Sequence, residues 1–398
     1  MLARLAIDGG NPVRSSPFPG WPVYDESDER ALLDVLHSGI WGVADDYQGR
    51  VATFAQRFAE FQQARFGICV ANGTLALELA LRALGIGAGD EVITTPYTFI
   101  ATASAVLAVG ARPVFADIDP ASYNLDPTKI EAALTNHTKA ILPVHVAGQP
   151  ADLDAIMDIA AHYGLRVLED ACHAWGAEWQ GRRVGAIGDM GVFSFQASKN
   201  LTAGEGGIVV TNDETLAELG WSLHNVGRIR RGARYYHAIL GSNLRMTEWQ
   251  GALLLSQLKR LPAQMATREA NANYLTQALL RFPGVVTLPG DARVTRHGRH
   301  FYIFRYQSAA FGGRSRDDFI AALQAEGIPA GAGYVPLYTS PAIVDTMKRM
   351  FGVSTPPVCP VVESLFQETV WLPQYVFLGT QNDMDSVAEA MAKIEGAR

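Results

Sequence analysis

The sequence predicts an α/β protein in which a large domain with a mainly parallel sheet is followed by a smaller α+β domain. Three observations support this prediction. The chain has 398 residues, enough for two or three domains of ordinary size. From about residue 66 to 170, short apolar runs alternate with helical stretches, as in parallel sheets with both faces covered. After a long helical region near residue 260, strand-like and helix-like segments follow without that alternation.

The chain should begin with an extended arm over residues 1–24, which are rich in Pro and Gly and show no helical or strand period. Such arms often lie across a partner subunit. We expect the large domain to cover residues 25–260 and the small domain residues 261–398. The large domain should open with an amphipathic helix, because DESDERALLDVLHSG starts with acidic residues, places Leu32, Leu33 and Leu36 on one side and stops at Gly39.

A second helix is expected from Val51 to Ala64, where Phe54, Phe58 and Phe61 recur at three to four residues. The alternating region then predicts strands in FGICVAN, EVITT, RPVFADI, KAILPVHV and LRVLED, with helices between them. The shorter pieces WGAEWQGRRVGAIGD, GVFSFQ and GGIVVTND are typical of hairpins or edge strands, and we expect them to complete the same sheet.

A long helix is expected from near Thr247, past Pro262, to about Phe282, bridging the two domains. The small domain should then contain a strand in HFYIFRYQ and helices in RDDFIAALQAEG and QNDMDSVAEAMAKIEG.

Composition excludes several classes of protein. Lys and Arg number 33 against 40 Asp and Glu, a net charge of −7 with no basic cluster large enough for nucleic acid or anionic lipid, so we expect no nucleic-acid or membrane partner. The three cysteines Cys69, Cys172 and Cys359 are far apart and form no CxxC pair, which indicates a reducing compartment. Without a signal peptide or an 18-residue apolar run, a cytoplasmic protein is expected.

Three features place a candidate site in the large domain. Asp170 ends the buried run LRVLED, and ligand-binding residues collect at such carboxyl ends. Lys199 follows the strand-like GVFSFQ and precedes a glycine-rich run; an amine held there can form a Schiff base. In ANGTLALELA a strand passes into a helix at Gly73 and Thr74, whose free N–H groups suit a phosphate.

A Schiff-base lysine, a carboxylate and a phosphate cradle together describe a site for pyridoxal 5′-phosphate (PLP). The carboxylate would keep the pyridinium nitrogen protonated, and the lysine would hold the aldehyde and later move protons. Two other sequence patterns do not indicate a further site. GIGAGD at residues 85–90 follows a helix and precedes a strand, the reverse of a dinucleotide-binding turn. With no HExxH and no clustered ligands, His145 and His224 are expected to be structural, and no metal is predicted.

The chain resembles the DegT/DnrJ/EryC1/StrS family of PLP-dependent sugar aminotransferases over nearly its whole length. The motifs NGTLALELAL, TPYTFIATASA, EDACHAWGA, FSFQASKNLTAGEGG and GSNLRMTEWQGA occur in that family's order. The resemblance implies PLP-dependent transferase fold type I, as in aspartate aminotransferase, and a homodimer with shared active sites. It also implies catalytic roles for Lys199 as the Schiff-base lysine and for Asp170 as the acid at the pyridine nitrogen.

Further cofactor contacts follow from the same resemblance. Phe99 matches the aromatic residue that stacks on the ring, where many members have tryptophan, and His173 stands where many members have a glutamine that bonds the cofactor's 3′ oxygen. The implied phosphate contacts are Gly73, Thr74 and Ser194, completed by Asn243 from the neighbouring subunit.

The resemblance also narrows the substrate. EDACHAWGAEWQGRRVG, YNLDP, PVHVAG and PFPGWPVYD are similar to the glutamine-dependent scyllo-inosose aminotransferases and the 3-amino-5-hydroxybenzoate synthases, which act on cyclic ketones. In YVPLYTSPA, Tyr338 stands where nucleotide-sugar aminotransferases commonly have histidine. We therefore expect transfer of an amino group from L-glutamine or L-glutamate to a keto-cyclitol or keto-sugar, with pyridoxamine phosphate in the catalytic cycle.

Four alternatives stay open or are disfavoured at this point. A nucleotide-linked keto-sugar aminotransferase, a 3-amino-5-hydroxybenzoate synthase-like enzyme and a non-catalytic regulatory member share the same motifs. The dehydratase branch replaces the lysine by histidine, so Lys199 argues against it.

The arginine-rich segment at residues 227–237 is expected to be a loop near the active site that receives substrate carboxylates.

Overall fold

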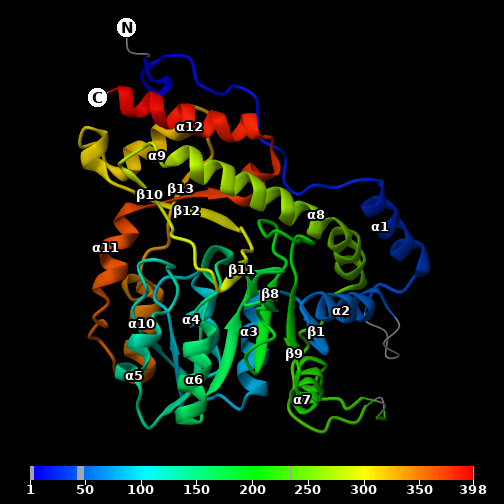
Figure 1. The fold of residues 1–398 in the computed structure, drawn as a ribbon. Coiled ribbons are helices and arrows are strands. Elements are labelled where there is room, and N and C mark those ends of the chain that lie inside the picture. Colours follow the sequence, from blue (N-terminus) through cyan, green and yellow to red (C-terminus); the bar gives the residue numbers. More distant parts are fainter. Residues whose placement is uncertain (1–3, 43–48, 231, 234, 398) are drawn as a thin grey trace.

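The structure, a computed structural model, describes residues 4–42, 49–230, 232, 233 and 235–397. In this part of the chain seven strands form the main sheet, in the order β1-β9-β8-β5-β4-β2-β3 (Figure 1). Their bounds are β1 Phe66–Val70, β9 Gly207–Thr211, β8 Met190–Ser194, β5 Arg166–Asp170, β4 Thr138–Leu142, β2 Glu91–Thr94 and β3 Arg112–Phe115.

The main sheet is parallel except at β9. All neighbouring pairs from β3 through β2, β4 and β5 to β8 are parallel, whereas β9 is antiparallel to both β8 and β1. The helices that alternate with these strands are α3 Gly73–Ala83, α4 Ala101–Ala108, α5 Ile130–Ala133, α6 Leu153–Tyr163 and α7 Glu214–His224. The predicted alternation and the mainly parallel sheet are therefore confirmed, and the turn at residues 85–90 lies between α3 and β2.

One expectation about the sheet is wrong. The segment WGAEWQGRRV forms the short strands β6 Glu178–Trp179 and β7 Arg182–Arg183, which do not join the main sheet. They form a separate small sheet with β11 Val294–Arg296, in which β6 pairs with β11. The strand partner comes from more than a hundred residues further along the chain, so local pattern could not reveal it.

The N-terminal arm packs against its own small domain. It contains the short 3₁₀ turn Ala6–Asp8, and Leu5 and Phe18 are buried in the core of that domain. The N–H groups of Ala6 and Val13 donate to the Glu326 carboxylate at 2.8 and 2.9 Å. These contacts fix the arm along the protomer that carries it.

Two helices follow the arm, as predicted. α1 Glu26–Ser38 begins with a capping box at Asp25 and ends at Gly39, whose φ of 68° suits glycine. α2 Arg50–Phe61 buries Phe54 and Phe58 completely.

The long helix α8 Glu248–Leu279 passes Pro262 without a break and crosses residue 260, where the domain boundary was expected. Within the described residues four strands form the small-domain sheet: β10 Val285–Thr287, β12 Phe301–Tyr306, β14 Thr369–Pro373 and β13 Gly331–Ala332. Its helices are α9 Arg316–Ala325, α10 Pro341–Phe351, α11 Pro360–Glu368 and α12 Gln381–Gly396. Figure 1 shows α8 between α12 and the main-sheet domain. No helix in the described part of the chain has both the length and the apolarity that crossing a membrane requires.

Candidate active site

A cavity of about 600 Å³ lies where the carboxyl ends of β5 and β8 meet the small domain. It is lined by seven of the eight residues proposed from the sequence as site residues: Gly73, Thr74, Phe99, Asp170, His173, Ser194 and Lys199. The small domain adds His300, Phe301 and Tyr334. The folded chain thus gathers residues from four of the five family motifs, together with residues of the small domain, around one space.

Asp170 is held rigidly at the end of β5. Its Oδ2 accepts a hydrogen bond from the Thr102 hydroxyl at 2.8 Å, and its Oδ1 accepts one from the Cys172 N–H at 3.2 Å. Thr102 in turn lies 2.9 Å from the Thr98 hydroxyl, four residues earlier. Because side chains alternate along a strand, the adjacent Glu169 is directed to the other side, where it binds His145 at 3.0 Å. Asp170 therefore presents a fixed carboxylate to the cavity.

Lys199 lies in the loop after β8, where its backbone N–H donates to the Gln196 carbonyl at 2.9 Å. Burial lowers the pKa of Lys199 below its ordinary value, and the opposing influence of Cys172 and Asp170 does not cancel this effect. A lowered pKa increases the fraction of neutral amine, the form that attacks a carbonyl carbon.

The N-terminus of α3 forms an anion cradle. Asn72 accepts hydrogen bonds from the Leu75 N–H with its side-chain oxygen and from the Ala76 N–H with its backbone carbonyl. The N–H groups of Gly73 and Thr74, in contrast, have no acceptor among the described residues. A Cβ at Gly73 would lie 2.8 Å from the Ser194 Cβ, which is too close. Glycine is therefore needed here, and the backbone stays open to a phosphate.

His173 and Phe99 complete the wall. The buried Nδ1 of His173 has no hydrogen-bond partner in the described part of the chain, and its Nε2 lies 3.4 Å from the Tyr334 hydroxyl. Burial, and then Lys199, lower the pKa of His173 well below its usual value. Phe99 is 56% exposed, which leaves its ring free at the cavity. An amine, a carboxylate, an anion cradle, an exposed ring and an unpartnered imidazole nitrogen together fit PLP.

Other predicted residues lie elsewhere in this protomer. Asn243 is exposed, its backbone forms an isolated antiparallel β-bridge with Asn225, and it does not line the cavity. Of the segment at residues 227–237, Arg231 and Arg234 lie outside the described residues, and none of the described ones lines the cavity. Tyr338 is buried and donates its hydroxyl to Glu363 at 3.0 Å, away from the cavity.

The two histidines expected to be structural are hydrogen-bonded inside the protein. His145 binds Glu169, and the Nδ1 of His224 lies 2.6 Å from the Trp221 carbonyl oxygen. Across the described ranges, no group of three or more His, Cys, Asp or Glu side chains could hold a metal ion.

The sequence did not single out three residues that line the cavity: Thr102, His300 and Tyr334. Thr102 lies in the quoted motif TPYTFIATASA, and its i, i+4 spacing from Thr98 on a helical turn was a usable signal. His300 and Tyr334 come from the small domain, and only the packing of the two domains brings them to Lys199.

Comparison with known proteins agrees with this geometry. The model of the DegT/DnrJ/EryC1/StrS aminotransferase family matches residues 22–392. The chain is 38% identical to the 3-amino-5-hydroxybenzoate synthase of Amycolatopsis mediterranei, covering 96% of this chain and 98% of that one. It is 37% identical to the L-glutamine:2-deoxy-scyllo-inosose aminotransferase of Streptoalloteichus tenebrarius, covering 99% and 98%.

A solved structure extends the comparison to the fold. The crystal structure of 3-amino-5-hydroxybenzoic acid synthase superimposes with a TM-score of 0.87 at 37% identity, covering 97% of this chain and all of that chain. The predicted fold class, PLP-dependent transferase fold type I, is confirmed.

Proposed function

Since the chain belongs to the DegT/DnrJ/EryC1/StrS aminotransferase family, we propose that it moves the amino group of L-glutamine to a cyclic ketone of the inosose type, with PLP as cofactor. The observation that carries this proposal is the cavity in which Lys199 and Asp170 lie beside the open N-terminus of α3. An amine, a carboxylate and an anion cradle in one enclosed space are what the cofactor requires.

When bound, PLP supplies a carbonyl carbon that accepts the amino group and a ring that withdraws electrons from it. Lys199 would hold the cofactor covalently, and as a free amine it would move the proton taken from the donor's Cα. Asp170 keeps the ring nitrogen protonated, and Thr102 holds the carboxylate in place.

The remaining residues orient the cofactor. The N–H groups of Gly73 and Thr74 and the hydroxyl of Ser194 bind its phosphate. Phe99 would stack on the ring, and the Nδ1 of His173 would bind the ring's oxygen substituent. Small-domain residues cover the other side of the cavity, which excludes water from the reacting atoms.

We propose a homodimer whose two active sites are shared. Leu33 and Leu36 of α1 are 49% and 46% exposed in the single protomer, and such apolar side chains are suited to an interface. Asn243 does not line the cavity of its own chain and would complete the phosphate site of the neighbouring subunit.

We also propose that the enzyme works in the cytoplasm, which the free thiols of Cys69, Cys172 and Cys359 support. For the chain itself we propose an arm over residues 1–24, a large domain over 25–260 and a small domain over 261–398. Apart from Leu5 and Phe18 of the arm, one buried cluster uses only residues from 272 to 394, and two others use only residues from 68 to 223, which supports this division; a further cluster, which contains Tyr97 and Ile303, joins the two domains.

A keto-cyclitol acceptor is favoured over a nucleotide-linked keto-sugar. Tyr338 replaces the histidine common in nucleotide-sugar aminotransferases and is directed toward Glu363 instead of the cavity. The second candidate is a reaction like that of 3-amino-5-hydroxybenzoate synthase, since the solved structure of that enzyme matches the whole architecture.

Three measurements test the proposal. Borohydride reduction of the protein with PLP, followed by peptide mass spectrometry, should trap the cofactor on Lys199; wild-type protein with no adduct at Lys199 would overturn the cofactor assignment. In a separate sample that has not been reduced, L-glutamine or L-glutamate should convert bound PLP to pyridoxamine phosphate, and absorbance spectra monitor this conversion. Finally, 2-deoxy-scyllo-inosose should reoxidise the pyridoxamine form, and failure with inososes but success with a nucleotide-linked keto-sugar would reject the acceptor.

A further inference from the structure

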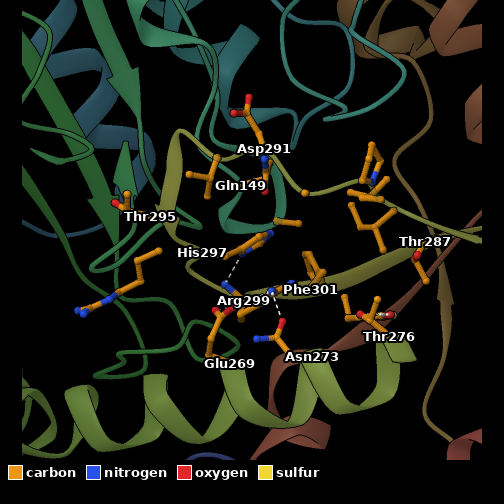
Figure 2. A pocket seen from close by; sticks show the side chains of 18 residues that line it. Gln149, Glu269, Asn273, Thr276, Thr287, Asp291, Thr295, His297, Arg299 and Phe301 are labelled. Atoms are coloured by element: carbon orange, nitrogen blue, oxygen red, sulfur yellow. Dashed lines mark hydrogen bonds and ion pairs between the residues drawn. The ribbon is translucent and has the colours of Figure 1, made fainter. Parts of the chain in front are cut away.

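A turn of the small domain, residues 297–300, is fastened both to residues 147–148 and to the loop that carries Lys199. The N–H of Gly298 donates to the Gly148 carbonyl at 2.8 Å, and the N–H of His300 donates to the Ala147 carbonyl at 2.9 Å. On its outer side, Arg299 binds Glu269 of α8 at 2.9 Å and Asn273 at 3.2 Å, as Figure 2 shows. Its inner side reaches Asn200, the residue that directly follows Lys199 in the chain.

Asn200 is buried, and its orientation is fixed by the turn. Its side-chain NH₂ donates to the carbonyl oxygens of Gly298 and Arg299 at 2.9 and 3.2 Å. The amide oxygen must therefore be the atom that faces the Nδ1 of His300 at 2.9 Å. Because a carbonyl oxygen only accepts, the Nδ1 of His300 carries the proton and the neutral ring has its lone pair on Nε2.

His300 is surrounded by basic groups. Its ring centre lies 4.5 Å from that of His173, and its other basic neighbours are Lys199 on the loop and Arg268 on α8. Burial, and then Lys199, His173 and Arg268, lower the pKa of His300 well below its usual value. Cys172 and Asp170 oppose the lowering of the pKa of Lys199. The lowered pKa of His300 agrees with the hydrogen bond of this residue, in which Nδ1 donates to the Asn200 amide oxygen.

We propose that Asn200 and His300 form a positioning pair, in which the Nδ1–H···O bond sets Lys199 in its reactive position and fixes the tautomer of the neutral His300 ring beside His173. This inference rests on the proposed function, because positioning of Lys199 matters only in an enzyme whose lysine binds PLP. Neither residue needs to touch the reacting atoms. The bond joins the small domain to the residue next to the lysine, so closure of the cavity and placement of the amine are coupled.

Two substitutions at His300 separate the hydrogen bond from ring packing. His300→Phe keeps a flat ring against His173 but has no N–H for Asn200. His300→Gln loses the ring but offers an amide N–H to the same acceptor. Asn200→Ala removes the acceptor of the same hydrogen bond and replaces His300→Phe in the test if that variant does not fold. Glu269→Gln is the matched control, since it weakens the outer anchor of the same turn and leaves the Asn200 bond intact.

The primary readout is independent of turnover. Apoprotein is mixed with PLP, and the rate of attachment to Lys199 is followed by absorbance across a pH series, with borohydride trapping to confirm the lysine. We expect His300→Phe and Asn200→Ala to slow attachment about 10- to 100-fold at neutral pH, the loss that follows when a reacting group is misplaced by about 1 Å. His300→Gln and Glu269→Gln should stay within about threefold of the wild type.

Each contrary outcome has a separate meaning. Wild-type protein that gives no adduct at Lys199 overturns the proposed function, and this inference with it. Wild-type protein that does give the adduct, together with a His300→Phe variant that reacts at the wild-type rate, overturns the positioning pair alone. Equal slowing in His300→Phe and His300→Gln would assign the effect to packing, and equal slowing in Glu269→Gln to general loosening of the turn; either result also overturns it.

Discussion

Replacing Glu169 by glutamine should destabilise the fold strongly, although the change removes only one charge. The Glu169 carboxylate is fully buried and accepts four hydrogen bonds. Its Oε1 accepts from the N–H groups of Ile187 and Gly188 at 2.8 and 2.7 Å. Its Oε2 accepts from the Gly185 N–H at 2.6 Å and from His145 at 3.0 Å. Glu169 thus secures the loop before β8 on the side opposite Asp170.

A glutamine can satisfy only half of these donors. Its oxygen can replace one carboxylate oxygen, but its NH₂ then faces two N–H groups. His145 cannot relieve the conflict by changing tautomer, because its Nδ1 already accepts from the Ala151 N–H at 3.0 Å. Two buried donors lose a charged acceptor, at about 1–3 kcal/mol each. We expect a loss of about 3–5 kcal/mol in the free energy of unfolding, which is also the range for breaking a buried pair from one side.

The assay is urea unfolding of the apoprotein at a fixed protomer concentration, followed by tryptophan fluorescence, because Trp175 and Trp179 lie in the adjacent buried cluster. Glu218→Gln is the control: Glu218 is exposed and pairs with Arg230 at 2.8 Å, and the substitution should cost less than about 1 kcal/mol. A loss below about 1 kcal/mol in Glu169→Gln, or equal losses in both variants, would refute the reasoning.

The same site predicts a pH dependence with a definite sign. Burial alone would raise the pKa of Glu169, but His145 and the N–H groups of Gly188 and Gly185 bring it below its ordinary value. A lowered folded pKa gives stability that is complete above the unfolded value of about 4.3 and is lost as the pH falls through the folded pKa. The stability difference between wild type and Glu169→Gln should therefore shrink in acid; a difference that widens there would contradict the assignment.

Three further predictions concern the cofactor site. Gly73→Ala should weaken PLP binding about tenfold or more, because its Cβ would press on Ser194, whereas Gly87→Ala, with nothing closer than 3.8 Å, should leave the affinity measured by absorbance titration unchanged. Asp170→Asn should bind PLP but lower the rate of its conversion by L-glutamine about 10²- to 10⁴-fold in single-turnover absorbance; a loss below threefold would exclude its role at the ring nitrogen. Mixing Lys199→Ala with Asn243→Ala protomers should restore about a quarter of wild-type activity, since random dimers then contain intact shared sites; no restoration would mean that Asn243 serves its own chain.

Much of this protein was determined by local sequence pattern. The alternation of apolar runs and amphipathic stretches predicted the strands and helices of the main sheet, because burial of one helix face or of a whole parallel strand leaves a periodic trace. The position of Asp170 at a strand end and of Gly73 at a helix start followed from the same boundaries. These features depend on neighbours within a few residues, so they are visible in the chain itself.

The tertiary structure decided the rest. No period in the sequence pairs β6 with β11, brings Tyr334 to His173, or fastens His300 to Asn200 across a hundred residues. The N-terminal arm, too, buries Leu5 and Phe18 in its own small domain. Such contacts join segments whose separation along the chain carries no local signal, and they form only when whole domains pack and bury their surfaces together. The sequence therefore predicted that Lys199 and Asp170 share a site, whereas packing alone determined which groups surround them.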